Sequence, residues 1–292
     1  MNARFFSLGR VRAIGSNTFT ELTRLRVFYV FLLFALLLIG SSVVMARLSF
    51  QQEFQVLKDI SLGAISIFTS LLAILATARM LPQDIEDRTV YTILAKPVAR
   101  SEYLVGKLAG VLVLLAISTA VMAALFFAAL YIREQSALAE TMRQMSAAPP
   151  EQVADALREI RDSTFHADLL AGIAAIFIKA AVLASLTLFI STFASSNIFT
   201  VVVAVVVYFI GHLQGTAREF WLQEQGAGWF TRIFLACVAL LFPDLQLFNL
   251  NDQVVAGATI PPAQFVETAL LGCFYVAIYL PLSVAVFARK EL

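Results

Sequence analysis

Long apolar runs separated by short polar segments dominate the pattern of hydrophobic and polar positions in this chain. About twenty apolar residues in a helix cross the core of a bilayer. Six segments reach or approach this length, and they are residues 27–47, 60–81, 103–132, 168–193, 197–213 and 265–288. A seventh apolar run, 229–242, is shorter and contains Arg232, which is typical of a re-entrant or interfacial segment. The pattern predicts an all-α polytopic membrane protein with six transmembrane helices in a single domain, residues 1–292.

Residues 7–26 precede the first long apolar run and carry a helical stripe of their own. The stripe recurs every three or four positions and consists of Val11, Ile14, Thr18, Leu22 and Leu25. The arginines that flank it are Arg10, Arg12, Arg24 and Arg26. We expect an amphipathic helix that lies in the membrane interface with these arginines against lipid phosphates. A disordered basic tail is the alternative.

The polar segment between the second and third apolar runs, residues 82–100, is predicted to contain a short amphipathic helix. Pro82 suits the first turn of a helix, where its missing N–H is not needed. Asp84 and Arg88 would then stand one turn apart as an ion pair, and Pro97 would end the helix. The apolar stripe of this helix would consist of Val90, Ile93 and Leu94. The alternative is a loop whose charges are only solvated.

The distribution of charge predicts how the chain is oriented. The side that includes residues 82–100 carries twelve Lys and Arg against six Asp and Glu, whereas the opposite side carries eight against fourteen. Because cytoplasmic loops are enriched in Lys and Arg, we expect both termini in the cytoplasm. Residues 214–264, with the re-entrant segment, and residues 133–166 would then lie outside. Pro149 and Pro150 break the second of these into a helical hairpin, which would either bind an external partner or only cap the bundle.

Lys179 is the one ionisable residue near the middle of a predicted span. About eleven residues, or 16 Å of helix, separate it from either end of that span. Its amine therefore cannot easily reach water, and charged side chains at such depth usually face a cavity or a partner. We expect Lys179 to line a water-filled cavity or a subunit interface, with a shifted span or hydrogen bonds to carbonyl groups as the alternatives.

The composition and the short motifs exclude several classes of function. The chain is 60% hydrophobic and 14% charged, which is more apolar than a soluble domain. Cys237 and Cys273 lie in apolar segments without the spacing of a metal site or a disulfide framework. The sequence has no GxxxxGK[ST], HExxH or GxSxG motif. We therefore expect no catalytic activity, cofactor or metal in this chain, and no nucleic acid as a partner because no basic tract is present.

Two stretches at the polar segment carry a more specific signal. They are Asp87-Arg88-Thr89 and Ile93-Leu94-Ala95-Lys96-Pro97-Val98-Ala99-Arg100-Ser101-Glu102-Tyr103-Leu104-Val105-Gly106-Lys107. Together they resemble the first cytoplasmic loop of ABC-2-type transporter permeases. Residues 13–22, 243–252 and 287–292 resemble the same family. The sequence of residues 94–107 is most similar to that of permeases that serve metalloenzyme maturation or gliding machinery.

The resemblance implies that the chain is the membrane subunit of an ATP-driven transporter. In that family the loop forms a coupling helix that docks on a separate ATPase subunit, and that subunit holds the ATP and Mg²⁺. Two ATPase subunits and a second permease copy, identical or not, would complete the assembly in the cytoplasmic (inner) membrane. The implied ATPase-contacting residues are Asp84, Glu86, Asp87, Arg88, Val90, Tyr91, Ile93 and Leu94. A secondary transporter and a non-transporting scaffold for an external complex are the alternatives.

Overall fold

Helices account for the regular secondary structure of the residues that the computed structural model describes, which are 7–48, 52–89, 98–146, 148–194, 196–223, 229 and 242–289. Six helical segments among them are long and apolar enough to cross a membrane. The predicted all-α membrane protein with six spans is therefore confirmed.

Five of the six spanning helices in the described part of the chain extend beyond the apolar stretches that predict them. The six helices are α2 (Arg26–Leu48), α3 (Glu53–Glu86), α5 (Arg100–Gln144), α7 (Asp168–Phe193), α8 (Asn197–Gln223) and α11 (Pro262–Arg289). The shorter elements are α1 (Leu8–Thr23), α6 (Pro150–Thr164), the 3₁₀ helix η1 (Leu245–Phe248) and α10 (Asn251–Val255). Only α7 has the bounds of its apolar run, because the flanks of the other runs contain polar residues that also favour a helix.

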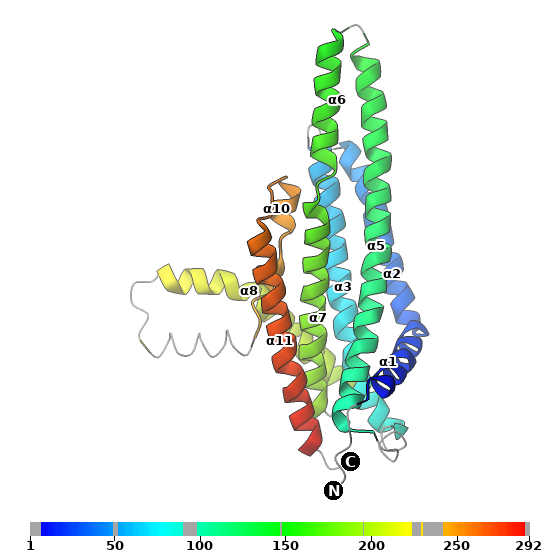
Figure 1. Cartoon of the computed structure of the whole chain (residues 1–292), viewed down its shortest axis with the longest axis vertical. Coiled ribbons are helices and arrows are strands. Elements are labelled where there is room, and N and C mark those ends of the chain that lie inside the picture. Colours follow the sequence, from blue (N-terminus) through cyan, green and yellow to red (C-terminus); the bar gives the residue numbers. More distant parts are fainter. Residues whose placement is uncertain are drawn as a thin grey trace.

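The centre of the bundle is formed by α3 and α7, which pack along each other (Figure 1). The opposite side of α7 packs against α11, while α2 and α5 pack against α3. The apolar stretches of α3 and α7 are mostly buried, whereas those of α2 and α8 are mostly exposed. Exposed apolar side chains include Leu37 of α2 and Val202 of α8. Such faces are compatible with lipid or with a neighbouring membrane subunit.

A helical hairpin extends beyond the rest of the bundle at the end opposite α1 (Figure 1). Its first arm is not a separate helix, because α5 continues without a break from its apolar part to Gln144. Pro150 is the first residue of the second arm, α6, where a proline needs no N–H. At the base of the hairpin Arg133 of α5, which is buried, donates to the carboxylate of Glu53 at the start of α3. The hairpin is thus fixed to the bundle by a charged contact.

Two short helices, η1 and α10, lie between α8 and α11. Their inward side chains Leu245, Phe248 and Val254 are buried. A Cβ atom added at Gly211 of α8 would lie 2.8 Å from Cγ of Leu245, so the close approach of η1 depends on this glycine. Most of the apolar run 229–242 lies outside the described residues.

Candidate functional site

The two flanks of the predicted coupling segment come together at one end of the bundle (Figure 1). On the first flank α3 ends at Glu86, and Asp87 is its C-cap. On the second flank α5 begins at Arg100. Four of the implied ATPase-contacting residues, Val90, Tyr91, Ile93 and Leu94, lie outside the described residues. The contacts that the structure describes therefore belong to the base of the segment, on its two flanks.

The predicted helix that starts at Pro82 is wrong in its first half. Pro82 lies inside α3, near its end, and the helix continues through it to Glu86. Leu81 is buried in the core and Ile85 packs against it, so burial favours this continuation over a break at the proline. Arg88 follows the end of α3 with φ of 56°, the left-handed conformation that often terminates helices. Asp84 and Arg88 are therefore not an i,i+4 pair on one helix.

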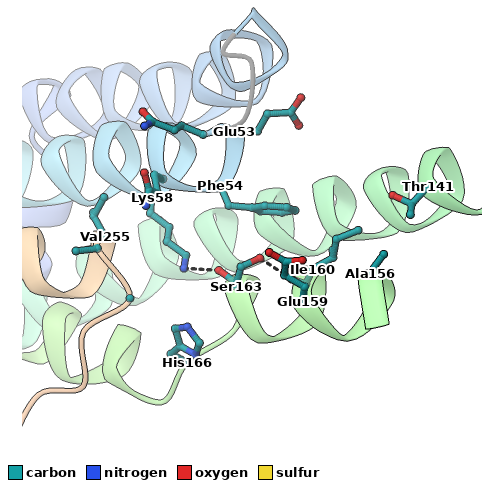
Figure 2. A pocket seen from close by; sticks show the side chains of 14 residues that line it. Glu53, Phe54, Lys58, Thr141, Ala156, Glu159, Ile160, Ser163, His166 and Val255 are labelled. Carbon is teal, nitrogen blue, oxygen red and sulfur yellow. Dashed lines mark hydrogen bonds between the residues drawn. The ribbon is translucent and has the colours of Figure 1, made fainter. Parts of the chain in front are cut away.

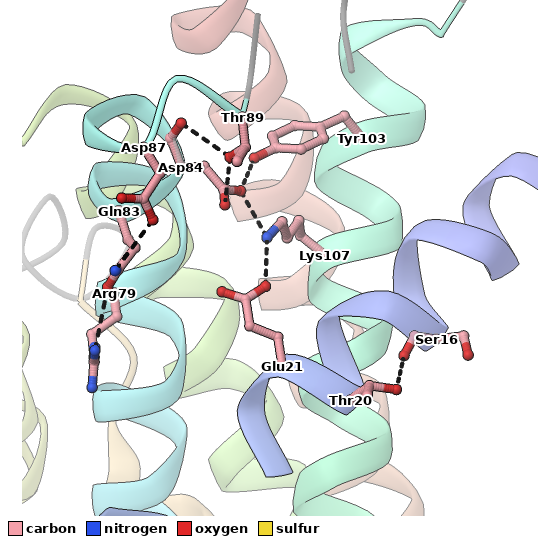
Figure 3. A network of polar contacts seen from close by, with 10 residues as sticks. All are labelled: Ser16, Thr20, Glu21, Arg79, Gln83, Asp84, Asp87, Thr89, Tyr103 and Lys107. Atoms are coloured by element: carbon pink, nitrogen blue, oxygen red, sulfur yellow. Dashed lines mark hydrogen bonds and ion pairs between the residues drawn. The ribbon is translucent and has the colours of Figure 1, made fainter. Parts of the chain in front are cut away.

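Asp84 faces the inside of the bundle, where it joins α3 to α5 and, through Lys107, to α1 (Figure 3). Nζ of Lys107 on α5 lies 2.7 Å from Oδ2 of Asp84 and 3.5 Å from Oε2 of Glu21 on α1. The hydroxyl of Tyr103 donates to the same Oδ2 atom, and Thr89 Oγ1 donates to Oδ1 at 3.2 Å. Asp84 is only 6% exposed and Lys107 only 3%. We call Asp84, Lys107, Tyr103, Thr89 and Glu21 the buried junction, in which Thr89 and Glu21 form the exposed edge.

The charged groups of the buried junction are stabilised by contacts with one another and with neighbouring hydroxyl groups. An isolated buried charge is strongly unfavourable, and an ion pair repays its desolvation only where further hydrogen bonds complete it. Here the carboxylate of Asp84 accepts from an ammonium group and two hydroxyl groups. The end of α3 is thereby held against α5 at the point where the coupling segment leaves the bundle.

A second charged contact fixes the start of α1 to the start of α5. The carboxylate of Glu102 is fully buried and accepts from Nε and Nη2 of Arg10 at 2.9 and 2.7 Å. It also accepts from the backbone N–H groups of Ser7, at 2.6 Å, and Ala99, at 3.0 Å. Ala99 is the N-cap of α5, two residues before Ser101, the residue that N-cap preference favours. Arg10 is thus used inside the protein and does not point to lipid phosphates as expected.

The first residue of α5 also reaches the last spanning helix. Nη1 of Arg100 donates to the carbonyl oxygens of Phe287 and Ala288, at 2.7 and 2.9 Å, at the C-terminal end of α11. A cation is favourable at this position because the last carbonyl groups of a helix carry partial negative charge. The ring of Phe287 stacks on that of Tyr103, with centroids 5.9 Å apart. The second flank of the coupling segment therefore contacts α1, α3 and α11.

Glycines allow α1 to lie directly on α5. A Cβ atom added at Gly110 would lie 2.6 Å from the carbonyl oxygen of Gly15, and one at Gly106 would lie 2.8 Å from Cβ of Ile14. Neither distance is tolerated by a real side chain, so the backbones meet only because these positions lack one. The predicted amphipathic helix over residues 7–26 is present as α1, with Val11 and Leu22 buried.

The remaining implied contact residues point outward. Glu86, Asp87 and Arg88 are exposed at the end of α3, next to the buried Asp84. Gln83 donates to Asp87 at 3.3 Å and accepts from Arg79 at 3.2 Å, so a chain of side chains runs up α3 to this exposed end (Figure 3). The structure brings these three exposed residues together and separates Asp84 from them, since Asp84 belongs to the buried junction.

Lys179 is buried between α7 and α3 of one chain, and its expected place at a water-filled cavity or a subunit interface stays a prediction. It is 2% exposed, and its Nζ donates to Oγ of Ser66, so it joins α7 to α3. The partner is a side-chain hydroxyl, whereas the alternative considered from sequence was a carbonyl group. Asp244, immediately before η1, is also 6% exposed. Asp244 lies outside the six predicted spans, next to the short helices. Inspection of the spans alone therefore does not find this buried carboxylate.

At the opposite end of the bundle, a pocket of about 410 Å³ lies where α3, α6 and α10 meet (Figure 2). Glu53, Glu159 and His166 contribute to its lining. Lys58 is 2% exposed, and its Nζ donates to the carbonyl oxygen of Ser163 at 2.8 Å, near the C-terminal end of α6. The lysine therefore joins the second arm of the hairpin to α3.

Among the described residues, no group of three or more His, Cys, Asp or Glu lies close enough together to hold a metal ion.

Comparison with known families supplies a direct assignment. The sequence model described as ABC-2 family transporter protein matches residues 13–292. The chain belongs to the ABC-2 transporter family. It is therefore a permease, the membrane component of an ABC transporter. No functionally curated protein matches this permease.

Proposed function

We propose that the permease is one half of a dimeric ATP-driven transporter, and that its residues 82–100 dock on an ATPase subunit in the cytoplasm. One observation supports this proposal above the others. The exposed end formed by Glu86, Asp87 and Arg88 sits directly on the buried junction, which joins α1, α3 and α5. A partner bound at this end would act on three helices at once.

Transmission of movement requires stiff connections at the base of the docking segment. Asp84 lies two residues before the exposed end and is held by Lys107 and Tyr103 of α5. Arg100 connects the other flank to α11. Rigid elements with fixed contacts carry displacement between sites, whereas a flexible loop would absorb it. We therefore assign the buried junction the role of transmitting the displacement of the docking segment to the spanning helices.

In the proposed cycle, ATP binding closes two ATPase subunits, which carry the docking segments of two permease copies with them. The copies rotate as rigid bodies and switch the passage between them from one side of the membrane to the other. ATP and Mg²⁺ stay in the ATPase subunits. The exposed charges of Asp87 and Arg88 would set the orientation of docking, and Val90, Ile93 and Leu94 would anchor it.

The distribution of charge supports the sidedness of this proposal. The end that carries α1, the flanks of residues 82–100 and the end of α11 is the one rich in Lys and Arg. We place it in the cytoplasm, with both termini, and place the permease in the cytoplasmic (inner) membrane. The hairpin of α5 and α6 then projects outside, where it is available to an external partner.

Reversal of one exposed charge tests the docking surface. Arg88→Glu should abolish or strongly reduce co-purification of a P-loop ATPase with the permease, because an acidic side chain would replace a cation at the docking surface. The matched control is Arg158→Glu, since Arg158 is equally cationic and exposed but lies on the hairpin. Both variants should reach the membrane in wild-type amounts.

Equal ATPase recovery with Arg88→Glu and Arg158→Glu would remove Arg88 from the docking surface. A wild-type complex without any ATPase would favour the scaffold alternative. The amount of each permease variant in the membrane, measured in the same preparations, separates a docking defect from a folding defect.

A further inference from the structure

A groove of about 530 Å³ lies between α1 and α5, beside the crossing of the two helices. Val11 and Phe19 of α1 form one wall, and Ala109, Gly110 and Val113 of α5 form the other. The groove exists because the backbones meet at Gly15 and Gly110, and the small residues next to this contact leave space unfilled. Its volume is in the range of about 300–1,000 Å³ that is typical of ligand pockets.

The groove combines apolar walls with a single charge. Arg12 is the only charged residue among the described residues that line it, and its side chain is exposed. Its neighbour Arg10 is turned inward and bound to Glu102. The basic side of α1 therefore contributes Arg12 at this position, together with the hydroxyl group of Ser16. This combination fits a ligand with an anionic head and an apolar tail.

The apolar wall continues along α5 beyond the groove. Val113, Ile117 and Val121 recur every four residues and are 49%, 45% and 43% exposed, respectively. They form one stripe along the spanning helix, because residues four apart lie on the same face. A chain that enters the groove at α1 can therefore continue along α5 towards the membrane centre.

We propose that the groove is a binding site for a glycerophospholipid of the leaflet in which α1 lies. The phosphate binds Arg12 and Ser16, and one acyl chain lies against Ala109 and Val113. A second copy of the chain is a poorer occupant, because an apolar surface placed on the groove would cover the guanidinium of Arg12 without a counter-charge. The bound lipid fills the space beside the crossing and holds α1 against α5.

The experiment measures binding of phosphatidylglycerol to the purified, delipidated full-length permease by native mass spectrometry. Arg12→Gln should weaken binding by about tenfold or more, because it removes a charge-assisted hydrogen bond. The matched control is Arg24→Gln, which removes an exposed cation at the other end of α1, away from the groove. It should bind phosphatidylglycerol as the wild type does.

A second pair of variants tests where the acyl chain lies. Val113→Trp fills the groove and should also reduce binding of phosphatidylglycerol, whereas Val202→Trp, at a similarly exposed apolar position on α8 away from the groove, should leave it nearly unchanged. Inorganic phosphate at the same concentration should not compete, because it lacks the acyl chain that the apolar walls bind.

Three results would overturn the proposal. Equal binding of phosphatidylglycerol by the Arg12→Gln and Arg24→Gln variants would mean that no specific phosphate contact exists. Competition by inorganic phosphate would reduce the site to a free-anion site. A loss of permease dimers in Val113→Trp with unchanged lipid binding would instead make the groove an interface between copies of the chain.

Discussion

Lys107 and Lys179 show two different ways to bury a lysine in this permease. Lys107 is 3% exposed and lies within ion-pair distance of Asp84 and Glu21. Lys179 is 2% exposed, and in the described part of the chain no carboxylate lies within 4 Å of its Nζ, which donates to Ser66 instead. The first lysine completes a set of contacts that depends on its charge. The second lies at a buried position where no carboxylate of the described chain offsets its charge.

Removal of Lys107 should give the largest effect on stability. Lys107→Met leaves the carboxylate of Asp84 buried without its cation, which costs about 3–5 kcal/mol of unfolding free energy. The unfolding midpoint of the purified permease should fall strongly. The double variant with Asp84→Asn should recover part of the loss, since it also removes the unpaired charge. A wild-type midpoint for Lys107→Met would show that the buried junction does not hold α3 to α5.

Tyr103→Phe should have an intermediate effect. It removes the hydroxyl that donates to Asp84 but keeps the ring that stacks on Phe287. Loss of one donor to a buried carboxylate costs about 1–3 kcal/mol, as the same unfolding measurement would report. The added effect of Lys107→Met should be smaller in this background than in the wild type, because both groups act on one carboxylate. Strictly additive effects would mean that the two contacts are independent.

Lys179→Met should have the smallest effect on stability. It replaces a buried amine by an apolar side chain of similar length and leaves Ser66 able to bond to its own helix backbone. Unfolding free energy should stay within about 1 kcal/mol of the wild type or rise. If the charge serves transport, the ATPase activity coupled to the permease should change all the same. Unchanged stability together with unchanged coupled activity would leave the charge of Lys179 without a function in transport.

The spanning helices could be predicted from the sequence because the pattern that defines them is long and local. The apolar run 168–193 coincides with α7, and the break at Pro149 and Pro150 separates α5 from α6. Local signals failed where packing decided the outcome. Pro82 is a plausible helix start in isolation, but burial of Leu81 and Ile85 carries α3 through it to Glu86.

The contacts of the site could not be predicted, because they join residues far apart in sequence. Asp84 pairs with Lys107, and Arg10 pairs with Glu102, whose position is 92 residues away. From their charge alone, each of these residues would be predicted to be exposed. The one available signal was the spacing of Gly106 and Gly110, which permits a helix to cross closely and thereby brings α1 to the start of α5.

In the proposed complex, an ATPase binds the end of the permease that carries residues 86–88. The most direct measurement is cross-linking in native membranes from a single cysteine placed at Asp87, in a chain whose Cys237 and Cys273 are replaced by alanine. We predict a cross-linked product that contains a P-loop ATPase from Asp87→Cys and none from Arg143→Cys at the hairpin end. An ATPase captured only from Arg143→Cys, or from neither position, would contradict the account.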